Sequence, residues 1–553
     1  MVTTVIIGGV AGGASCAARL RRNDERMNII VLERGPYVSF ANCGLPYYLS
    51  GIIAREKDLL LASPGYFRQR FNIDVRTGHS VYSIDRDRRV VCVRQVGDHV
   101  DYEIPYDHLV LSPGARPIKP PLPGVDLPGI FSLRSVPDSN MIRAWIDRHK
   151  VKHCVVVGGG FIGLEVADNL HHLGIEVTLV DRLTQVMATL DPEMAKPLAD
   201  QIRARGVDLR LGREVTGFER PMHGRERMTV AFSGGERLDT DMIVLAIGVR
   251  PESELAKACG LEIGPRGHIV VDSQMRTSDP QIFAVGDAVE VVCAITRGKA
   301  AVPLAGPANG QGRLAADIIA GKRRSFRGVQ GTSVCGAFGL TFATTGLNEQ
   351  ALRSCGIPYE VVYAHPTNHV GYYPCATAIS MKLLYDSGSG RVLGAQALGK
   401  DGVERRIDVI AMAIQLGATV FDLEEAELCY APQYGAAKDP VNMVGMVAAN
   451  SMRGDLAITH WEHMGCDGAL VLDVRTKAEV DKEPMPCDIH IPIDELRAKM
   501  DVLPKGKPLQ ITCRVGARAY NAARLLTQHG FHASVLSGGV CTWTHYAEVS
   551  QGQ

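Results

Sequence analysis

Short apolar runs alternate with amphipathic stretches along the first half of the chain. Residues 2–8 form an apolar run that ends in glycine, residues 12–22 carry alanine, cysteine and leucine at helical spacing, and residues 27–33 form a second apolar run that ends in an acid. This pattern predicts a βαβ unit with parallel strands. The pattern returns at residues 152–158, 161–173 and 176–181. Further strands are predicted at residues 107–112 and 241–247.

The pattern changes after residue 328. Alternating positions at residues 379–385 and 391–398 predict antiparallel strands, and helical spacing follows at residues 403–416 and 440–452. A final block follows a short connector. Its predicted strands are residues 469–473, 508–513 and 533–536, and its predicted helix is residues 518–528. The chain is therefore expected to fold as several domains.

Composition and charge exclude several classes of protein. The 60 basic and 60 acidic residues give a formal net charge of zero, so neither nucleic acid nor an acidic surface is expected as a partner. No apolar run approaches the roughly 18–20 residues that span a bilayer, and the N-terminus lacks the basic region of a signal peptide. The 14 cysteines show no paired metal-binding spacing. These features predict a cytoplasmic protein with no membrane span and no metal site.

The second βαβ unit contains a complete dinucleotide-binding motif, GGGFIG, at residues 158–163. In such a motif Gly158 makes the tight turn, Gly160 lets the backbone approach a pyrophosphate, and Gly163 packs the helix on the strand. Asp181 follows Gly163 by 18 residues, close to the spacing of an acid that binds a ribose. The unit therefore favours NADH, and the neighbouring Arg182 leaves NADPH open.

The first βαβ unit departs from this motif. Its sequence is GGVAGG at residues 8–13, so Val10 stands where the second glycine is expected, although Gly8 and Gly13 are in place. Glu33 follows Gly13 by 20 residues, as a ribose-binding acid should. Alone, this unit is moderate evidence for a second dinucleotide.

Further motifs in the sequence relate both βαβ units to one known family. TSDPQIFAVGDA at residues 277–288, SPG at residues 112–114 and AIG at residues 246–248 resemble the flavoprotein disulfide reductases that bind two dinucleotides, over about residues 1–450. The resemblance implies FAD at the first unit, with Asp287 on its ribitol and Glu33 on its adenosine ribose, and NADH or NADPH at the second. The expected cofactor-binding residues are Gly8, Val10, Gly13, Glu33, Arg34, Ser112, Gly114, Gly158, Gly160, Gly163, Asp181, Gly248 and Asp287.

Cys43 is the candidate redox residue. It stands among glycine, proline and polar residues, whereas a lone cysteine is more often a small buried hydrophobe. Dithiol members of the superfamily carry a second cysteine five positions later, where this chain has Tyr48. The chain thus resembles the single-cysteine branch: coenzyme A disulfide reductases, NADH-dependent persulfide reductases, and NADH oxidases or peroxidases. Attack on sulfur needs a thiolate, so a helix N-terminus or the flavin is expected to lower the Cys43 pKa.

Two tyrosine motifs resemble the coenzyme A disulfide reductase group. The motifs are GYYP at residues 371–374 and LCYAPQY at residues 428–434, although Gln433 and Gly435 depart from that group. In that group the tyrosines reach the active site of the partner subunit, which points to Tyr372 and Tyr430. Simple packing at a dimer interface is the alternative.

The same resemblance implies a coenzyme A site. Arg19 and Arg22 lie three positions apart on one helix face and suit phosphates, although exposed arginines of helices are often only solvated. A lysine that the group carries after Phe67 is absent, with Arg68 or Arg70 as candidate replacements. The implied coenzyme A residues are Ser15, Arg19, Arg22, Ser39, Asn42, Asn309 and Lys438.

The last block carries a second candidate sulfur site, Cys513, in the loop CRVGAR at residues 513–518 between a strand and a helix. Successive backbone N–H groups in such a loop favour an anion, and Arg514, Arg518 and the helix dipole add positive potential. LDVR at residues 472–475, HIPI at residues 490–493 and LSGGVCTW at residues 536–543 resemble the small rhodanese domain, over about residues 460–548. There the cysteine matching Cys513 carries sulfane sulfur. Arg475 is expected to be structural and Cys541 to be a packing residue.

These observations predict an α/β chain with two Rossmann-like dinucleotide-binding domains, an α+β dimerisation domain and a C-terminal α/β rhodanese domain. The predicted bounds are 1–118 with 249–327 for the FAD domain, 119–248 for the NAD(P)H domain, 328–450 for dimerisation, 451–459 for a linker and 460–553 for rhodanese. The family implies a homodimer.

The predicted activity is reduction of persulfides, polysulfides or coenzyme A disulfide by NAD(P)H, through FAD and Cys43, with Cys513 handling sulfane sulfur and with release of sulfide or thiol. Tyr372 or Tyr430 is the expected proton donor to the leaving sulfur. One alternative is an NADH oxidase or peroxidase that cycles Cys43 through sulfenic acid. Another is a sulfurtransferase whose flavin half senses redox state.

Overall fold

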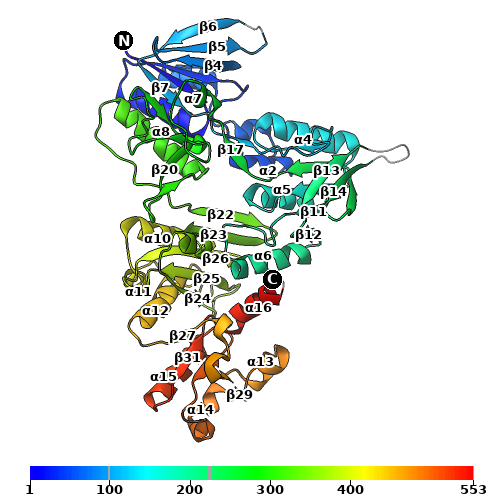
Figure 1. Ribbon diagram of the computed structural model, residues 1–553, viewed down its shortest axis with the longest axis vertical. Helices are drawn as coiled ribbons and strands as arrows, with labels where there is room; N and C mark the ends of the chain where they lie inside the picture. Colours follow the sequence, from blue (N-terminus) through cyan, green and yellow to red (C-terminus); the bar gives the residue numbers. More distant parts are fainter. Residues whose placement is uncertain (98–99, 221–226, 552–553) are drawn as a thin grey trace. The chain divides into compact units, whose positions relative to one another are not determined.

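The computed structural model describes residues 1–97, 100–220 and 227–551 (Figure 1). The last two positions of the predicted rhodanese domain, 552–553, lie outside the described residues. The chain divides into two compact units, residues 1–184 with 206–329 and residues 185–205 with 330–553.

The first unit is built on two five-stranded sheets of parallel strands. One sheet has the order β19-β7-β1-β2-β3, and the other has the order β12-β11-β10-β16-β9. The strands of the first sheet are β1 (Thr3–Ile7), β2 (Asn28–Glu33), β3 (Asp74–Thr77), β7 (His108–Leu111) and β19 (Ile282–Ala284). Those of the second are β9 (Ile130–Phe131), β10 (His153–Val157), β11 (Glu176–Val180), β12 (Asp208–Arg210) and β16 (Met242–Leu245). Both predicted βαβ units are therefore present, each at the centre of its sheet.

Helices follow the central strands of both sheets. In the first βαβ unit α1 (Ala11–Asn23) joins β1 to β2, and in the second α5 (Phe161–His172) joins β10 to β11. Other helices of this unit are α2 (Leu45–Leu49), α3 (Pro64–Phe71), α4 (Val136–His149), α7 (Glu254–Ala258) and α8 (Ala305–Ile319). The unit also contains two three-stranded antiparallel sheets, β4 (His79–Asp85) with β5 (Val90–Gln95) and β6 (Asp101–Pro105), and β13 (Val215–Glu219) with β14 (Met228–Phe232) and β15 (Arg237–Thr240). The aliphatic faces of α1, α8 and the first sheet share one buried core.

The second unit contains an antiparallel sheet with the order β22-β23-β26-β25-β24. Its strands are β22 (Ser333–Ala337), β23 (Leu340–Gly346), β24 (Glu360–Ala364), β25 (Ile379–Tyr385) and β26 (Val392–Gly399). Helices α10 (Val403–Leu416) and α12 (Pro440–Met452) pack on this sheet, as does α6 (Pro192–Ala204). The antiparallel strands and both helices predicted from the sequence for this part of the chain are confirmed.

A smaller parallel sheet forms the C-terminal part of the second unit, with the order β27-β31-β30-β28-β29. The strands are β27 (Ile458–Thr459), β28 (Leu470–Asp473), β29 (Ile489–His490), β30 (Leu509–Thr512) and β31 (Ala533–Leu536). The helices are α13 (Lys477–Lys482), α14 (Ile493–Lys499), α15 (Ala517–Gln528) and α16 (Gly539–Gln551). Its own aliphatic core lies between the sheet and α15.

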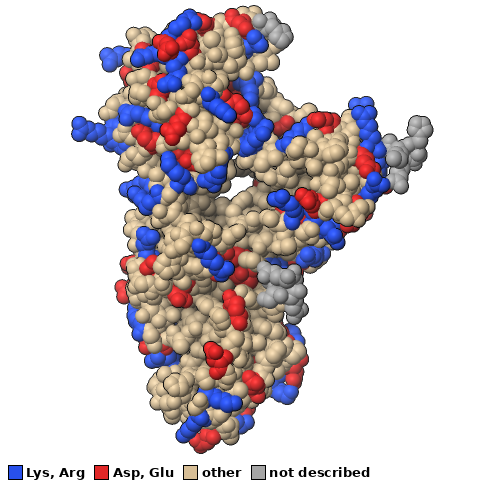
Figure 2. Space-filling view, in the orientation of Figure 1, with Lys and Arg blue, Asp and Glu red and all other residues tan. Residues whose placement is uncertain are grey.

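Charged side chains of both signs are interspersed over the face of the molecule that Figure 2 shows. This agrees with the zero formal net charge of the sequence. No helix within the described ranges combines the length and the apolar character that crossing a membrane requires.

Candidate active site

The two glycine-rich turns have the same construction. Gly8 and Gly158 adopt left-handed φ angles of 95° and 111°, which favour glycine. A Cβ added to Gly13 would lie 1.9 Å from the carbonyl oxygen of Gly8, and one added to Gly163 would lie 1.8 Å from that of Gly158. Each helix therefore starts in contact with its strand, with its first N–H groups directed away from the sheet, as a bound pyrophosphate needs.

Glu33, the last residue of β2, and Asp181, directly after β11, are hydrogen-bonded to these turns. Glu33 accepts a hydrogen bond from Gly9 N at 2.9 Å, and Asp181 accepts one from Gly159 N at 2.6 Å. Each carboxylate is therefore fixed beside its glycine turn, where a ribose attached to the pyrophosphate would lie. The turns and their acids fit two dinucleotides.

The departure of the first turn at Val10 has a structural reason. Val10 is the N-cap of α1, and its φ of −100° is not the left-handed conformation that favours glycine. The close approach in this unit occurs instead between α1 and α8, because a Cβ added to Gly312 would lie 2.1 Å from the carbonyl oxygen of Gly12. No nucleotide-binding motif in the sequence includes Gly312.

Several residues predicted for FAD meet beside the first turn. A Cβ on Gly8 would lie 2.1 Å from the carbonyl oxygen of Ser112, and the left-handed Gly114 follows two residues later. Asp287 lies in the short helix η3 (Gly286–Ala288) and pairs with Arg134, with 3.3 Å between Oδ2 and a guanidinium nitrogen. Arg134 was not predicted, because nothing in the local sequence marks it. Of two other predicted residues, Arg34 pairs with Glu252, and Gly248, with a φ of 110°, directly precedes β17 (Val249–Pro251).

Cys43 lies in the short helix η1 (Asn42–Gly44), directly before α2, and is exposed. Partial desolvation, followed by the carboxylates of Glu165 and Asp287, raises the pKa of its thiol, and the weaker effect of Arg134 lowers it. The sequence-based expectation of a lowered Cys43 pKa is therefore wrong for the groups that the chain itself supplies. The main reason is partial desolvation of the thiol, and the carboxylates of Glu165 and Asp287 add to it.

Tyr48, in the place of a second cysteine, is part of the packing. Its ring is buried beneath the guanidinium of Arg143, at 4.3 Å from the ring centroid, and its hydroxyl donates to Asn140 Oδ1 at 3.2 Å. The neighbouring Tyr47 hydroxyl lies 3.3 Å from Glu165 Oε1. Glu165, which sequence analysis missed, thus connects α5 with the segment that follows Cys43.

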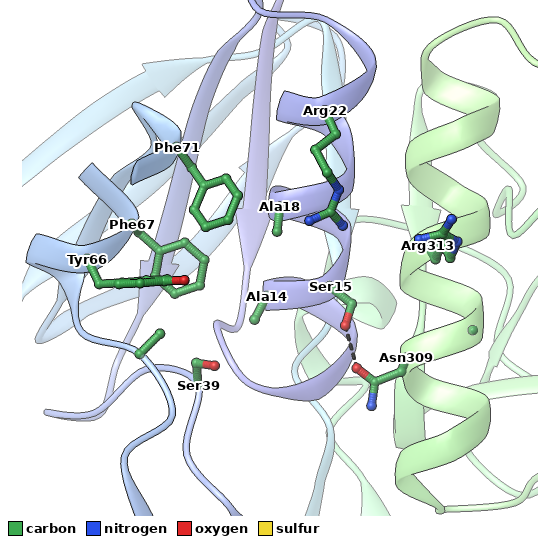
Figure 3. A pocket seen from close by; sticks show the side chains of 12 residues that line it. Ala14, Ser15, Ala18, Arg22, Ser39, Tyr66, Phe67, Phe71, Asn309 and Arg313 are labelled. Atoms are coloured by element: carbon green, nitrogen blue, oxygen red, sulfur yellow. Dashed lines mark hydrogen bonds between the residues drawn. The ribbon is translucent and has the colours of Figure 1, made fainter. Parts of the chain in front are cut away.

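A cavity of about 430 Å³ lies between α1, α3 and α8 (Figure 3). Figure 3 shows the aromatic side chains of α3 on one side, Arg22 on α1 and Arg313 on α8. Aromatic rings beside two arginines suit a ligand that combines an aromatic base with phosphates. The lining residues are Ala14, Ser15, Ala18, Arg22, Ser39, Ala62, Tyr66, Phe67, Phe71, Asn309, Gly310 and Arg313.

The structure brings together four of the seven residues predicted for coenzyme A, namely Ser15, Arg22, Ser39 and Asn309, with Ser15 bonded to Asn309. Arg19 does not line the cavity, because its guanidinium is paired with Asp317 at 2.7 Å.

The other two predicted residues also lie outside the lining. Asn42 is next to Cys43, and its Oδ1 atom is buried without a partner among the described residues. Lys438 belongs to the other unit and is exposed. Of the candidate replacements for the missing lysine, Arg70 lies over the ring of Tyr66, and neither it nor Arg68 lines the cavity.

The two predicted tyrosines are in direct contact. The hydroxyl oxygens of Tyr372 and Tyr430 are 2.9 Å apart, and both side chains are exposed. The hydrogen bond from Tyr372 raises the pKa of Tyr430. Tyr430 therefore keeps its proton at neutral pH, and both hydroxyls lie on an exposed surface of the second unit.

The loop after β30 surrounds the sulfur of Cys513. Gly516 N and Ala519 N donate to Cys513 Sγ at 3.2 and 3.4 Å, and the guanidinium of Arg518 also contacts it. Such a set of donors favours an anionic sulfur. Arg514 is exposed and contacts the Cys541 thiol.

The fully buried Arg475 makes three hydrogen bonds to the carboxylate of Asp473, which suits the structural role expected for it. This ion pair holds the end of β28 in place.

One acidic cluster has the spacing of a metal site, formed by Asp191, Glu193 and Glu349. Its centre holds the buried ammonium of Lys382, whose Nζ lies 2.5–2.7 Å from an oxygen of each carboxylate. The cluster is therefore an internal ion network.

Comparisons with known proteins agree with this geometry. Residues 2–312 match the pyridine nucleotide-disulphide oxidoreductase family, residues 333–439 match the dimerisation domain of the same family, and residues 457–546 match the rhodanese-like domain. The chain belongs to the pyridine nucleotide-disulphide oxidoreductases and carries a rhodanese-like domain. The predicted fold class and enzyme class are thereby confirmed.

Individual relatives are similar to this chain over most of its length. The coenzyme A disulfide reductase of Staphylococcus haemolyticus is 35% identical over 447 residues, which cover 80% of this chain and 98% of the relative. The structure of reduced CoADR-RHD from Bacillus anthracis is 44% identical with a TM-score of 0.95, covering 98% of each chain. A NAD-dependent persulfide reductase from A. fulgidus is 37% identical with a TM-score of 0.90, covering 98% of this chain and all of that one.

Proposed function

We propose that this protein uses NADH to reduce the sulfur–sulfur bond of persulfides or of coenzyme A disulfide at Cys43, and that Cys513 carries sulfane sulfur in the same chain. The observation that carries the proposal is the presence of two sulfur sites of different construction. One is an exposed cysteine beside a dinucleotide site, with tyrosine in place of a second cysteine. The other is a buried cysteine within a set of N–H donors.

The chain's own residues would bind both cofactors. The Gly8–Gly13 turn, Glu33, Ser112 and Asp287 would hold FAD, and the Gly158–Gly163 turn with Asp181 would hold NADH. Bound FAD would take a hydride from NADH and supply two electrons to a sulfur. The Asp181 carboxylate disfavours the additional phosphate of NADPH, so NADH is the assigned donor.

Cys43 would act as the nucleophile. Its thiolate attacks one sulfur of the substrate, so that a mixed disulfide with Cys43 forms and the other sulfur leaves as a thiolate or as hydrosulfide. Two electrons and a proton then restore the Cys43 thiolate and release the second thiol. Because partial desolvation and the nearby carboxylates raise the Cys43 pKa, the thiolate depends on stabilisation by what binds beside it.

The remaining groups would orient the substrate. Arg22 and Arg313 suit the phosphates of coenzyme A, and the aromatic wall of the cavity suits its adenine. The proton for the leaving sulfur is assigned to the Tyr372–Tyr430 pair in a homodimer. A cytoplasmic location fits the 14 cysteines, which are all free thiols.

The deciding experiment is anaerobic NADH oxidation by the FAD-loaded protein, with coenzyme A persulfide, coenzyme A disulfide and hydrogen peroxide compared as acceptors. The proposal predicts turnover with the sulfur acceptors that Cys43→Ser abolishes and that Cys355→Ser, at another exposed cysteine, leaves unchanged. A preference for peroxide would instead make the protein an oxidase or peroxidase. Undiminished turnover in Cys43→Ser would reject the assigned nucleophile.

A further inference from the structure

Arg518, which contacts the sulfur of Cys513, is held from its other side by a carboxylate. The two terminal guanidinium nitrogens of Arg518 donate to the two oxygens of Glu479 at 2.7 and 2.6 Å. Arg518 lies in α15, directly after the Cys513 loop, and Glu479 lies in α13, on a separate segment of the rhodanese domain. The bidentate pair therefore joins the sulfur site to a second helix.

Glu479 is itself held in place and charged. The backbone N–H and the hydroxyl of Thr476 donate to Glu479 Oε2 at 3.0 and 2.9 Å, which forms the capping box of α13. The hydrogen bonds from Arg518 are the largest of the effects that lower the pKa of Glu479 to about 2. Glu479 is therefore ionised at every pH at which sulfur transfer would be assayed.

The geometry restricts Arg518 to one orientation. A guanidinium is planar and carries its donors in a rigid fork, so a bidentate carboxylate fixes both its position and its plane. The side chain of Arg518 is about one-third exposed (32%), and without a partner it would be free to turn towards solvent. With Glu479 present, the guanidinium stays against Cys513 Sγ.

We propose that Glu479 is a positioning residue for sulfur transfer, which acts by holding Arg518 against the anionic sulfur of Cys513. The proposal rests on the sulfur-carrying role proposed for Cys513. In the loaded state Cys513 carries a persulfide anion, whose charge is stabilised by Gly516 N, Ala519 N and the pre-oriented Arg518. Glu479 contributes orientation and does not touch the reacting sulfur.

The test is sulfur transfer from thiosulfate to cyanide by the full-length FAD-loaded protein. In the first step the Cys513 thiolate takes the outer sulfur of thiosulfate and releases sulfite. In the second step cyanide takes that sulfur from the persulfide, so that thiocyanate leaves and the thiolate returns. Glu479→Gln keeps the shape of the side chain and removes its charge, and we expect kcat to fall about tenfold.

A double-mutant cycle separates positioning from general stability. We expect Arg518→Gln alone to reduce kcat by a similar factor, and Glu479→Gln to have no further effect in the Arg518→Gln background, because Glu479 acts only through Arg518. The rate of Cys513 alkylation by iodoacetamide should fall in parallel. Asp481→Asn, which removes another carboxylate of α13 that pairs with Lys477, is the matched control and should leave kcat unchanged.

The outcomes are distinct. Additive losses in the double variant, or an unchanged kcat in Glu479→Gln, would overturn the positioning role. Glu479→Asp, which keeps the charge, should recover part of the lost rate, and fluorescence of Trp461 and Trp543 within the same domain checks that each variant is folded. A wild-type Cys513 that takes up no sulfur, seen by mass spectrometry, would reject the proposed function of the domain and the inference with it.

Discussion

At the scale of single residues, the two turn acids show how one carboxylate serves both folding and recognition. Glu33 and Asp181 each satisfy a backbone N–H group of a glycine-rich turn and remain beside the place where a ribose is expected. The glycines of each turn are required by close packing and by left-handed φ angles, and this requirement does not depend on the acid. A substitution of the acid therefore tests nucleotide binding more than folding.

Asp181→Ala should change the choice between NADH and NADPH. Removing the carboxylate removes its repulsion of a phosphate on the ribose and leaves Arg182 nearby, so we expect the ratio of kcat/KM for NADH to that for NADPH to fall by about tenfold or more. The measurement is steady-state kinetics with both nucleotides and coenzyme A disulfide. Asp208→Asn, at a half-exposed carboxylate of β12 that pairs with Arg210, is the control. An unaltered ratio would show that Asp181 does not face the ribose.

Arg22→Ala should weaken binding of coenzyme A substrates without affecting NADH. Arg22 lines the cavity, and a lost phosphate contact at a partly exposed site costs about 1–2 kcal/mol, so the KM for coenzyme A disulfide should rise about tenfold. Arg26→Ala is the control, because Arg26 is almost fully exposed (92%) and its ion pair is with the neighbouring Asp24. If both variants behave alike, the cavity is not the coenzyme A site.

At the scale of elements, the packing of α1 on α8 depends on a glycine that the nucleotide motifs do not include. Gly312→Ala would place a methyl group 2.1 Å from the carbonyl oxygen of Gly12, so the helices must separate, at a cost of about 1–3 kcal/mol. Gly306→Ala lies in the same helix with nothing within 4 Å and should be neutral or stabilising. Thermal unfolding of both variants measures the difference. Equal melting temperatures would contradict the close approach of the helices.

The sequence predicts well those parts of the site that are local in the chain. The turn at residues 158–163 with Asp181, the Cys43 segment and the Cys513 loop each lie within one strand–loop–helix unit, so that spacing alone reveals them. The aromatic wall of the cavity and Arg313 were missed because the cavity is assembled from three helices far apart in the sequence. Glu479 was missed for another reason: a Thr-x-x-Glu spacing at a helix start already has a complete local explanation as a capping box.

At the scale of the whole chain, the segment at residues 185–205 is remote in sequence from the rest of the second unit and is joined to it through Lys382. The Lys382 ammonium is fully buried and contacts Asp191 and Glu193 of that segment together with Glu349. Burial raises the pKa of Asp191 in spite of Lys382, whereas the pKa of Glu349 falls to about 2. The positive charge of Lys382 thus offsets the free-energy cost of burying these carboxylates.

Lys382→Met should destabilise the protein by about 3–5 kcal/mol at neutral pH, because it leaves buried carboxylates without a counter-charge. A lowered Glu349 pKa contributes stability above its unfolded value near 4.5, and this contribution is lost as pH falls towards 2. The deficit of the variant should therefore be largest above about pH 5 and should shrink as the pH falls and the unpaired carboxylates take up protons. Denaturant unfolding at several pH values measures it. Lys499→Met, at an exposed pair with Glu495 on α14, should cost less than about 1 kcal/mol at every pH.

Because one chain contains two sulfur sites, we expect each site to perform a different reaction, and variants of each cysteine can separate the two reactions. Cys513→Ser should keep coenzyme A disulfide reduction and lose NADH oxidation driven by thiosulfate, whereas Cys43→Ser should keep sulfur loading of Cys513 and lose both reductions.

A tether gives an effective concentration in the mM range when geometry permits, so direct transfer between the sites would exceed transfer between separate molecules at micromolar concentration. Mixing the two variants should then restore little activity. If free coenzyme A restores it, the sulfur travels as a coenzyme A persulfide; full recovery without coenzyme A would mean that the tether has no role in transfer.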